Sequence, residues 1–208
     1  MSASSSASAG PSLPFGTTPG LNICSLLPSA TEIVFALGLG DRLVAVTHEC
    51  DFPPEAARLR VITRSTLHHL TPGSREIHNH ISSAVHAGSS IYALDHDLLE
   101  RLNPDLILTQ ELCDVCAVSY DVVEQAVHRL EGHRIILSLE PTSLGSILET
   151  VEQVGQATEA QERAAAVVRE LQTRIDRIAA RAPTAPGRPR VFAMEWLDPP
   201  LHRRPLGT

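Results

Sequence analysis

The chain has 208 residues, a formal net charge of -7 and 43% hydrophobic residues, so it can form one full domain, or one and a half, with a buried core. An acidic chain without a basic stripe is unlike a nucleic-acid-binding protein, and the absence of lysine excludes a Schiff-base or phosphate-loop lysine. No apolar run reaches the roughly 18 residues that cross a bilayer, so we expect no transmembrane segment.

The first segment, residues 1–20, consists mainly of Ser, Ala, Gly, Pro and Thr. Such a composition buries too little apolar surface to offset the entropy of ordering, so we expect a disordered tail. The segment has neither the charged start nor the apolar run of a secretory signal. On this ground the sequence predicts a cytoplasmic protein.

Residues 21–141 alternate short apolar runs with helical patterns, which predicts an α/β lobe with a mostly parallel sheet and flanking helices. Short apolar runs predict strands at 21–27, 43–47, 61–63, 105–109 and 134–139. Helical spacing predicts helices near 29–37, 74–85, 94–102 and 120–130. The first of these helices is expected to begin with a capping box of Ser29 and Glu32.

Beyond this lobe, apolar residues keep a helical spacing over 142–181, which predicts one long helix that spans two lobes. A Pro-rich linker is expected over 182–189. Residues 190–208 then contain one further strand, at 190–196, followed by a Pro- and Arg-rich tail. We expect this segment to be the truncated start of a second lobe.

Cysteines follow two of the predicted strands. The pair Cys113 and Cys116 has the Cys-x-x-Cys spacing of half a zinc site or a redox couple, and Cys50 lies next to His48-Glu49. Because parallel strands end at one edge of a sheet, Cys50, Cys113 and Cys116 could meet around zinc. The alternative is that they are reduced thiols lining a cleft.

Catalytic motifs are weak. There is no Gly-x-Ser-x-Gly elbow, and His48 is a poor base for Cys50 because nothing at a strand end orients its ring. The His-rich segment 65–90 is read as a solvated loop rather than a metal site, since no His pair has the spacing of a zinc-binding helix. We therefore predict a protein that is not an enzyme.

Several motifs occur in a characteristic order: SLLPSATE at 25–32, LGLGDRLV at 37–44, VTHECDFPP at 46–54, VITRS at 61–65, LNPDLI at 102–107, TQELCDVC at 109–116 and EWLDPP at 195–200. With them the chain resembles the cobalamin- and iron-siderophore-binding proteins of ABC transporters, and most closely the cobalamin-binding members. The resemblance implies a periplasmic-binding-protein-like fold in which two lobes are joined by one long helix. It also implies that the ligand lies between the lobes, at the carboxyl ends of the strands.

The resemblance places ligand-binding residues on four segments of the first lobe: Pro28, Ser29, Ala30 and Thr31; Glu49 and Cys50; Arg64; and Gln110, Leu112 and Cys113. Backbone N–H groups at the start of the first helix would face a ligand acceptor, in agreement with the physics of helix ends. Glu49 would accept hydrogen bonds from the amide side chains of a corrin.

The function implied is non-enzymatic binding of cobalamin, or a related corrinoid or metal chelate, as the solute-binding component of an ABC uptake system. Its partners would be that ligand and an ABC permease, with no required cofactor. The alternative is a cytoplasmic zinc- or thiol-redox-handling protein centred on Cys50, Cys113 and Cys116.

Overall fold

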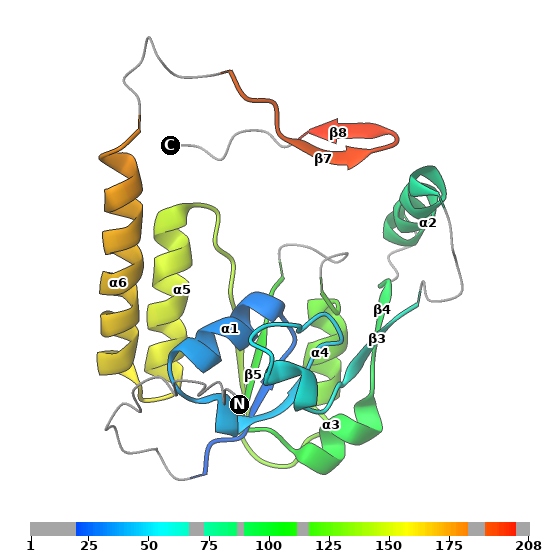
Figure 1. Ribbon diagram of the computed structural model, residues 1–208. Helices are drawn as coiled ribbons and strands as arrows, with labels where there is room; N and C mark the ends of the chain where they lie inside the picture. The colour runs from blue at the N-terminus through cyan, green and yellow to red at the C-terminus, as the bar shows by residue number, and fades with distance from the viewer. Residues whose placement is uncertain (1–19, 67–72, 87–89, 112–116, 183–189, 203–208) are drawn as a thin grey trace, which may run out of the picture.

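The computed structural model describes residues 20–66, 73–86, 90–111, 117–182 and 190–202 (Figure 1). Nearly all of the expected N-terminal tail, and most of the expected linker, lie outside these ranges. Within them, no helix is both long and apolar enough to cross a membrane.

A four-stranded parallel sheet forms the centre of the molecule, in the order β2-β1-β5-β6. Its strands are β1 (Ile23–Ser25), β2 (Leu43–Val46), β5 (Leu106–Thr109) and β6 (Ile135–Ser138). All three pairings are parallel. The two inner strands are buried throughout, as expected for parallel strands covered on both faces. The predicted α/β class is therefore confirmed.

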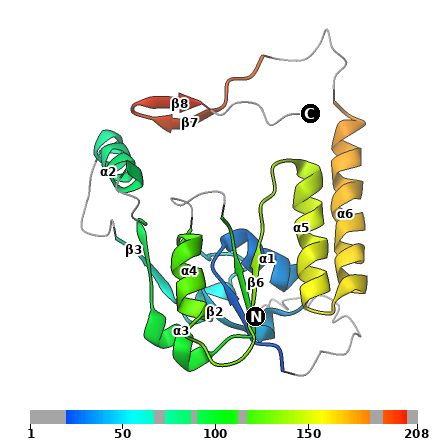
Figure 2. The ribbon, with the colours of Figure 1, turned by 180° about the vertical axis from the view of Figure 1, so that it is seen from behind.

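Helices cover both faces of this sheet (Figures 1 and 2). One apolar layer packs β1 and β5 against α1 (Pro28–Ala36) and α5 (Leu144–Ala157). The other packs them against α3 (His96–Leu102) and α4 (Tyr120–Val127). Because strand side chains alternate, Leu106 and Leu108 enter the first layer and Ile107 the second.

The start of α1 differs from the expectation. Leu27 is the N-cap residue, without a side-chain cap, and Pro28 is the first helical residue. Proline suits this position because its missing N–H would have no helical partner there. Ser29 thus lies inside the helix, so the predicted Ser29–Glu32 capping box is wrong. A capping box does occur at the start of α5, between Ser143 and Ser146.

The single long helix expected over 142–181 is also wrong. The chain forms two helices, α5 and α6 (Gln161–Ala179), which pack side by side. Between them Glu159 adopts a left-handed backbone, with φ of 55°. The helices approach so closely that a Cβ at Gly155 would collide with Ala164. The apolar spacing continues through both helices because each buries one face, so it does not reveal the turn.

Smaller elements surround the sheet. β3 (Thr63–Ser65) pairs antiparallel with β4 (Tyr92–Leu94), and Val61 bridges to Val46 of β2. Short 3-10 helices occupy Gly40–Arg42 and Ala56–Arg58. The predicted strand at 190–196 becomes β7 (Met194–Leu197), paired with β8 (Pro200–His202). Neither β4 nor β8 was predicted.

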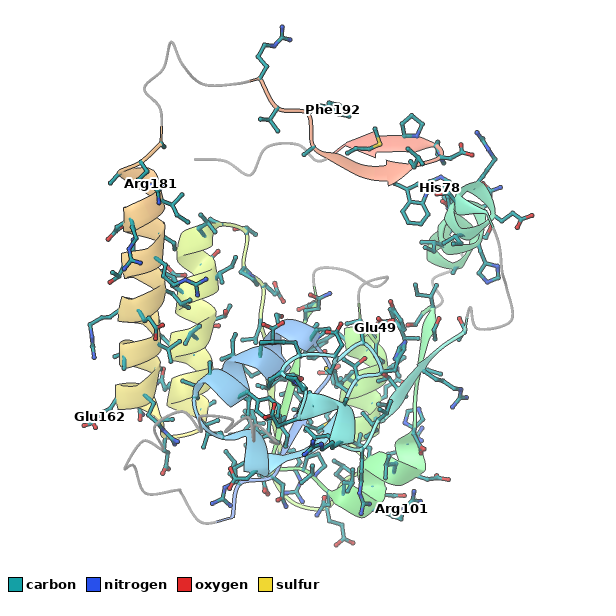
Figure 3. The ribbon with its side chains drawn as sticks, in the orientation of Figure 1. Glu49, His78, Arg101, Glu162, Arg181 and Phe192 are labelled. Carbon is teal, nitrogen blue, oxygen red and sulfur yellow. The ribbon has the colours of Figure 1, made fainter. Side chains whose placement is uncertain are left out.

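Helix α2 (Ser74–His86) lies beside the β7–β8 hairpin (Figures 1 and 3). An ion pair joins Arg75 of this helix to Asp198, in the turn between β7 and β8. Both elements lie beyond the edge of the sheet at which its strands end.

Candidate ligand-binding site

A cavity of about 230 Å³ opens at the carboxyl edge of the sheet. Its lining comes from the segments that follow β1 and β2, from β4, and from the residues before α4: Leu26, Pro28, Thr47, Glu49, Tyr92, Ala117 and Val118. Open parallel sheets bind ligands at this edge because the connections to the helices diverge there. The location therefore agrees with a binding site.

The cavity wall has an apolar part and a polar part. Four apolar side chains come from the segment after β1, up to the first residue of α1, and from the approach to α4. The polar part consists of the Thr47 hydroxyl, the Glu49 carboxylate and the Tyr92 phenol. No cationic side chain lines the cavity among the residues that the structure describes.

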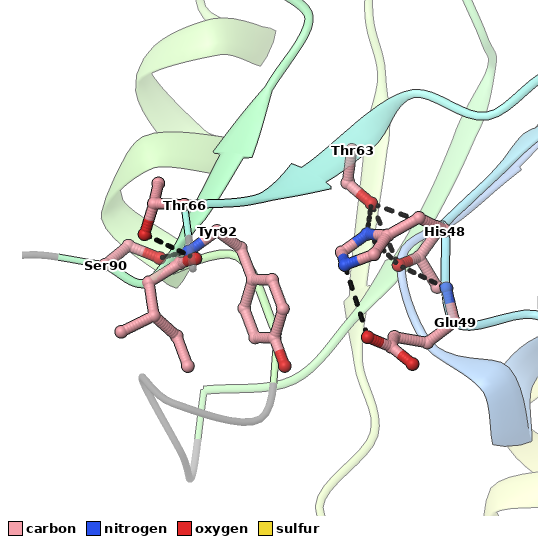
Figure 4. Close-up of polar contacts among 8 residues, drawn as sticks. His48, Glu49, Thr63, Thr66, Ser90 and Tyr92 are labelled. Atoms are coloured by element: carbon pink, nitrogen blue, oxygen red, sulfur yellow. Dashed lines mark hydrogen bonds and ion pairs between the residues drawn. The ribbon is translucent and has the colours of Figure 1, made fainter. Parts of the chain in front are cut away.

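A network of short polar contacts supports this polar wall (Figure 4). Thr63 Oγ1 donates to Thr47 Oγ1 at 2.9 Å and lies 2.7 Å from His48 Nδ1. The backbone N–H of His48 donates to the same Thr63 oxygen at 3.1 Å. His48 Nε2 lies 3.2 Å from Glu49 Oε1, an ion-pair contact rather than an aligned hydrogen bond.

Tyr92 completes the wall from β4. Its ring centroid lies 5.3 Å from that of His48, with the planes tilted by 56°. Burial, and then the charge of Glu49, raise the pKa of the Tyr92 phenol. Its ordinary value is already near 10, so the phenol is uncharged at neutral pH and can donate a hydrogen bond.

A second polar cluster lies at the same edge but inside the core. Thr31 Oγ1 donates to Ser25 Oγ at 2.8 Å and contacts Cys50 Sγ at 3.1 Å, and Ser25 Oγ donates to the Leu27 carbonyl. Ser25 and Thr31 are fully buried, and Cys50 is 8% exposed. These three side chains satisfy one another, which indicates a structural role.

The residues predicted for the site separate into several groups. Pro28 and Glu49 line the cavity, whereas Ala30, Thr31 and Cys50 are buried and Ser29 is exposed.

The other predicted residues do not line the cavity in the described part of the chain. Arg64 is exposed on β3, and since Thr63 faces His48, strand alternation turns Arg64 to the other side. Gln110 is half-buried, and its Nε2 has no hydrogen-bond partner among the described residues. Leu112 and Cys113 lie outside the described residues.

Several lining residues were not predicted: Leu26, Thr47, Tyr92, Ala117 and Val118, with Thr63 behind them. Tyr92 lies on a strand that the sequence pattern did not reveal. Thr47 had a signal, because it immediately precedes the His48-Glu49 pair at the end of a predicted strand. The link from Thr63 to His48 joins residues 15 positions apart and needs the pairing of strands to be known.

The zinc hypothesis finds little support in the described residues. Cys113 and Cys116 lie outside them, and within them no group of three His, Cys, Asp or Glu side chains could hold a metal ion. Burial raises the pKa of the remaining candidate, Cys50, despite hydrogen bonds from Thr31 and Thr47 that lower it. A metal is bound by a thiolate, so this environment disfavours Cys50 as a ligand.

Comparison with known proteins defines the class. A family model described as periplasmic binding protein matches residues 23–201, and the chain belongs to this family. Family members bind a substrate rather than convert it, and the zinc- or redox-handling alternative has no support in the comparisons.

Among curated proteins, the vitamin B12-binding protein of Vibrio cholerae is 50% identical over 58 residues, which are 27% of this chain and 21% of the relative. An ABC transporter substrate-binding lipoprotein of Bacillus subtilis, YvrC, is 24% identical over 162 residues, or 78% of this chain and 42% of the relative. The aligned region thus spans less than half the length of these relatives.

Solved structures share the fold. A possible iron-binding periplasmic protein of Staphylococcus epidermidis aligns with a TM-score of 0.60 and 22% identity, over 83% of this chain and 55% of that one. The periplasmic vitamin B12-binding protein BtuF of Vibrio cholerae aligns with a TM-score of 0.54 and 22% identity, over 88% and 58%.

These relatives correct the predicted location. They are named as periplasmic proteins or as a lipoprotein, which contradicts the cytoplasmic expectation. That expectation rested on residues 1–20, in which we found neither the charged start nor the apolar run of a secretory signal.

Proposed function

We propose that this chain binds a corrinoid such as cobalamin, without chemical conversion, as the solute-binding component of an ABC uptake system. Family membership and the local identity with vitamin B12-binding proteins support the proposal. So does a cavity at the sheet edge where such a fold would hold a ligand. The partner would be an ABC permease, and the corrinoid would be a ligand rather than a cofactor.

The size of the cavity indicates how much of the ligand it would hold. Complete small-molecule pockets usually measure about 300–1,000 Å³. A cavity of about 230 Å³ is smaller, so it would hold one edge of a corrinoid. The four apolar side chains would pack against the ring system, and the polar wall would face its substituents.

The charge of the cavity wall is the observation that favours a corrinoid. Glu49 contributes a carboxylate, Tyr92 an uncharged phenol, and no cation lines the cavity among the described residues. A carboxylate accepts strong hydrogen bonds from N–H groups and repels other carboxylates. Corrinoids carry amide side chains, whereas haem carries propionates, so this wall favours the corrinoid.

Calorimetric titration of the purified chain with cyanocobalamin, beside a titration with haemin, tests the proposal. We expect one-to-one binding of cyanocobalamin and weaker binding of haemin. Glu49→Gln should weaken cyanocobalamin binding about tenfold, because a charge-assisted hydrogen bond becomes a neutral one. Glu124→Gln, at an exposed position on α4, is the matched control and should leave the affinity unchanged.

Two results would contradict the proposal. Haemin could bind more tightly than cyanocobalamin, which would point to a carboxylate-bearing tetrapyrrole as the ligand. Equal affinities of the wild type and Glu49→Gln would show that the carboxylate does not contact the corrinoid.

A further inference from the structure

The polar network beneath the cavity has a defined direction (Figure 4). Thr63 has one hydroxyl proton, and it is donated to Thr47 Oγ1 at 2.9 Å. The Thr63 oxygen therefore acts as the acceptor toward His48 Nδ1, at 2.7 Å, and toward the His48 backbone N–H. This arrangement favours a proton on His48 Nδ1, a nitrogen that also lies 3.4 Å from Thr47 Oγ1.

This arrangement fixes the orientation of the imidazole ring. With Nδ1 held by Thr63, the opposite nitrogen, Nε2, is presented to Glu49 Oε1 at 3.2 Å. The ring attracts that carboxylate in its cationic form, with both nitrogens protonated, whereas the neutral ring with its proton on Nδ1 would present the lone pair of Nε2 to it. The contact therefore holds Glu49 when the imidazole is protonated. The His48 side chain is 15% exposed and that of Glu49 is 58% exposed, so the imidazole is the fixed partner and the carboxylate the movable one.

Glu49 contributes the carboxylate of this wall, and the His48 ring behind it contributes a positive charge only when it is protonated. The thiol of Cys50 is buried with a raised pKa, and the Tyr92 phenol is uncharged at neutral pH. Arg64, the nearest cation along β3, is turned to the other side of the strand. The position of one carboxylate therefore largely determines what this wall accepts.

We propose that Thr63 and His48 are positioning residues that hold the Glu49 carboxylate against the cavity, where it selects ligands that present amide donors over ligands that present a carboxylate. The inference rests on the proposed function, because a corrinoid supplies the amides. It adds that Glu49 determines the specificity of the site and that Thr63 and His48 hold Glu49 in position. Without the network, Glu49 would be free to turn toward solvent and the selection would weaken.

Isosteric variants of Thr63 test this role. Thr63→Val removes the hydroxyl and keeps the shape, whereas Thr63→Ser keeps the hydroxyl. The probes are cyanocobalamin and its three monocarboxylates, each with a different ring propionamide hydrolysed. We expect the wild type and Thr63→Ser to disfavour at least one monocarboxylate about tenfold, since like charges then face each other.

The ratio of affinities separates positioning from a general defect. In Thr63→Val we expect the preference to fall below about threefold, as in Glu49→Gln. A merely structural role would lower both affinities together and leave the ratio unchanged. If Thr63→Val still binds cyanocobalamin and its ratio of affinities for cyanocobalamin and the monocarboxylate equals that of the wild type, the inference is overturned.

A measurement on the free protein distinguishes the two proposals. Nitrogen-15 NMR of the His48 ring, assigned with His48→Gln, should show a protonated Nδ1 in the wild type and Thr63→Ser, and a change in Thr63→Val. A wild-type Nδ1 without a proton would overturn the network. Absence of corrinoid binding with the expected ring signals would overturn the proposed function and the selectivity, and confirm the network alone.

Discussion

Two clusters of hydroxyl-bearing side chains lie at the same edge of the sheet and have different roles. Ser25 and Thr31, with Cys50, form a closed set inside the core. Thr47 and Thr63 form an open set that continues through a histidine to a carboxylate on the cavity wall. The two clusters share their residue types and their position at the edge of the sheet. Neither property therefore shows which cluster belongs to the ligand-binding site.

The difference arises from what each cluster contacts at its outer end. The closed set ends on the Leu27 carbonyl, beneath α1, where every polar group must find a partner within the protein. The open set ends on Glu49, whose side chain is 58% exposed. A ligand can compete for contacts only at the open end.

The largest expected effect is a loss of stability at high pH, caused by the thiol of Cys24, which is fully buried and lies outside both clusters. Burial, and then the charge of Cys50, raise the pKa of Cys24 from 9.0 to about 12. Above pH 9 the unfolded chain releases this proton while the folded chain keeps it, so stability is lost as the pH rises. Between pH 8 and 11 the free energy of unfolding should fall by about 2–3 kcal/mol from this thiol. Urea denaturation at both pH values measures the loss.

The matched variant for this measurement is Cys24→Ala. It should be less stable than the wild type at pH 8, because a cavity forms, yet lose less stability on going to pH 11. Equal losses in the two proteins would show that Cys24 does not carry the effect. Cys50 and Tyr92, with raised pKa values of their own, contribute to both proteins alike.

A substitution within the closed cluster should destabilise the fold and leave ligand selection intact. Thr31→Val removes the donor to Ser25 and the contact with Cys50 at nearly constant volume. We expect a loss of about 2 kcal/mol in the free energy of unfolding, because buried polar groups lose their partner. Thr31→Ser should recover part of it. A changed preference between cyanocobalamin and its monocarboxylates would show that the clusters are not independent.

The smallest effect is expected for the phenol on the open side. Tyr92→Phe keeps the ring and removes one donor, so cyanocobalamin should bind about threefold more weakly, with unfolding unaffected. Tyr120→Phe, at the start of α4, replaces the second of the two tyrosines in the chain and serves as the control. Equal affinities in the wild type and Tyr92→Phe would remove the phenol from the contact surface.

The central sheet was predictable because its strands are short and apolar, and the two inner strands are buried on both faces. The separation of α5 from α6 was not, since the turn at Thr158–Ala160 has no glycine or proline and the apolar spacing continues on both sides. The Ser29–Glu32 spacing was misleading for a local reason. Pro28 occupies the first helical position and moves the cap to Leu27.

The candidate site was predictable only in part. Pro28 and Glu49, which line the cavity, were predicted from the family resemblance, and both lie on segments that follow predicted strands. Tyr92 reaches the cavity through the pairing of β3 with β4, a contact between segments far apart in the sequence. Such contacts follow from the three-dimensional arrangement of the strands and leave no local pattern.

The pairing of α5 with α6 has a consequence for the path of the chain. One helix over 143–180 would travel roughly 57 Å in a single direction, away from the edge at which β6 ends. Instead, α6 runs antiparallel beside α5, so the chain returns to the end of the molecule at which α5 begins and continues past it (Figures 1 and 2). Because α6 reverses the direction of α5, β7 and β8 lie on the side of the molecule at which the strands of the sheet end. An extra turn in α5 or α6 would change how far β7 and β8 lie from the sheet, and would leave them on the same side of it.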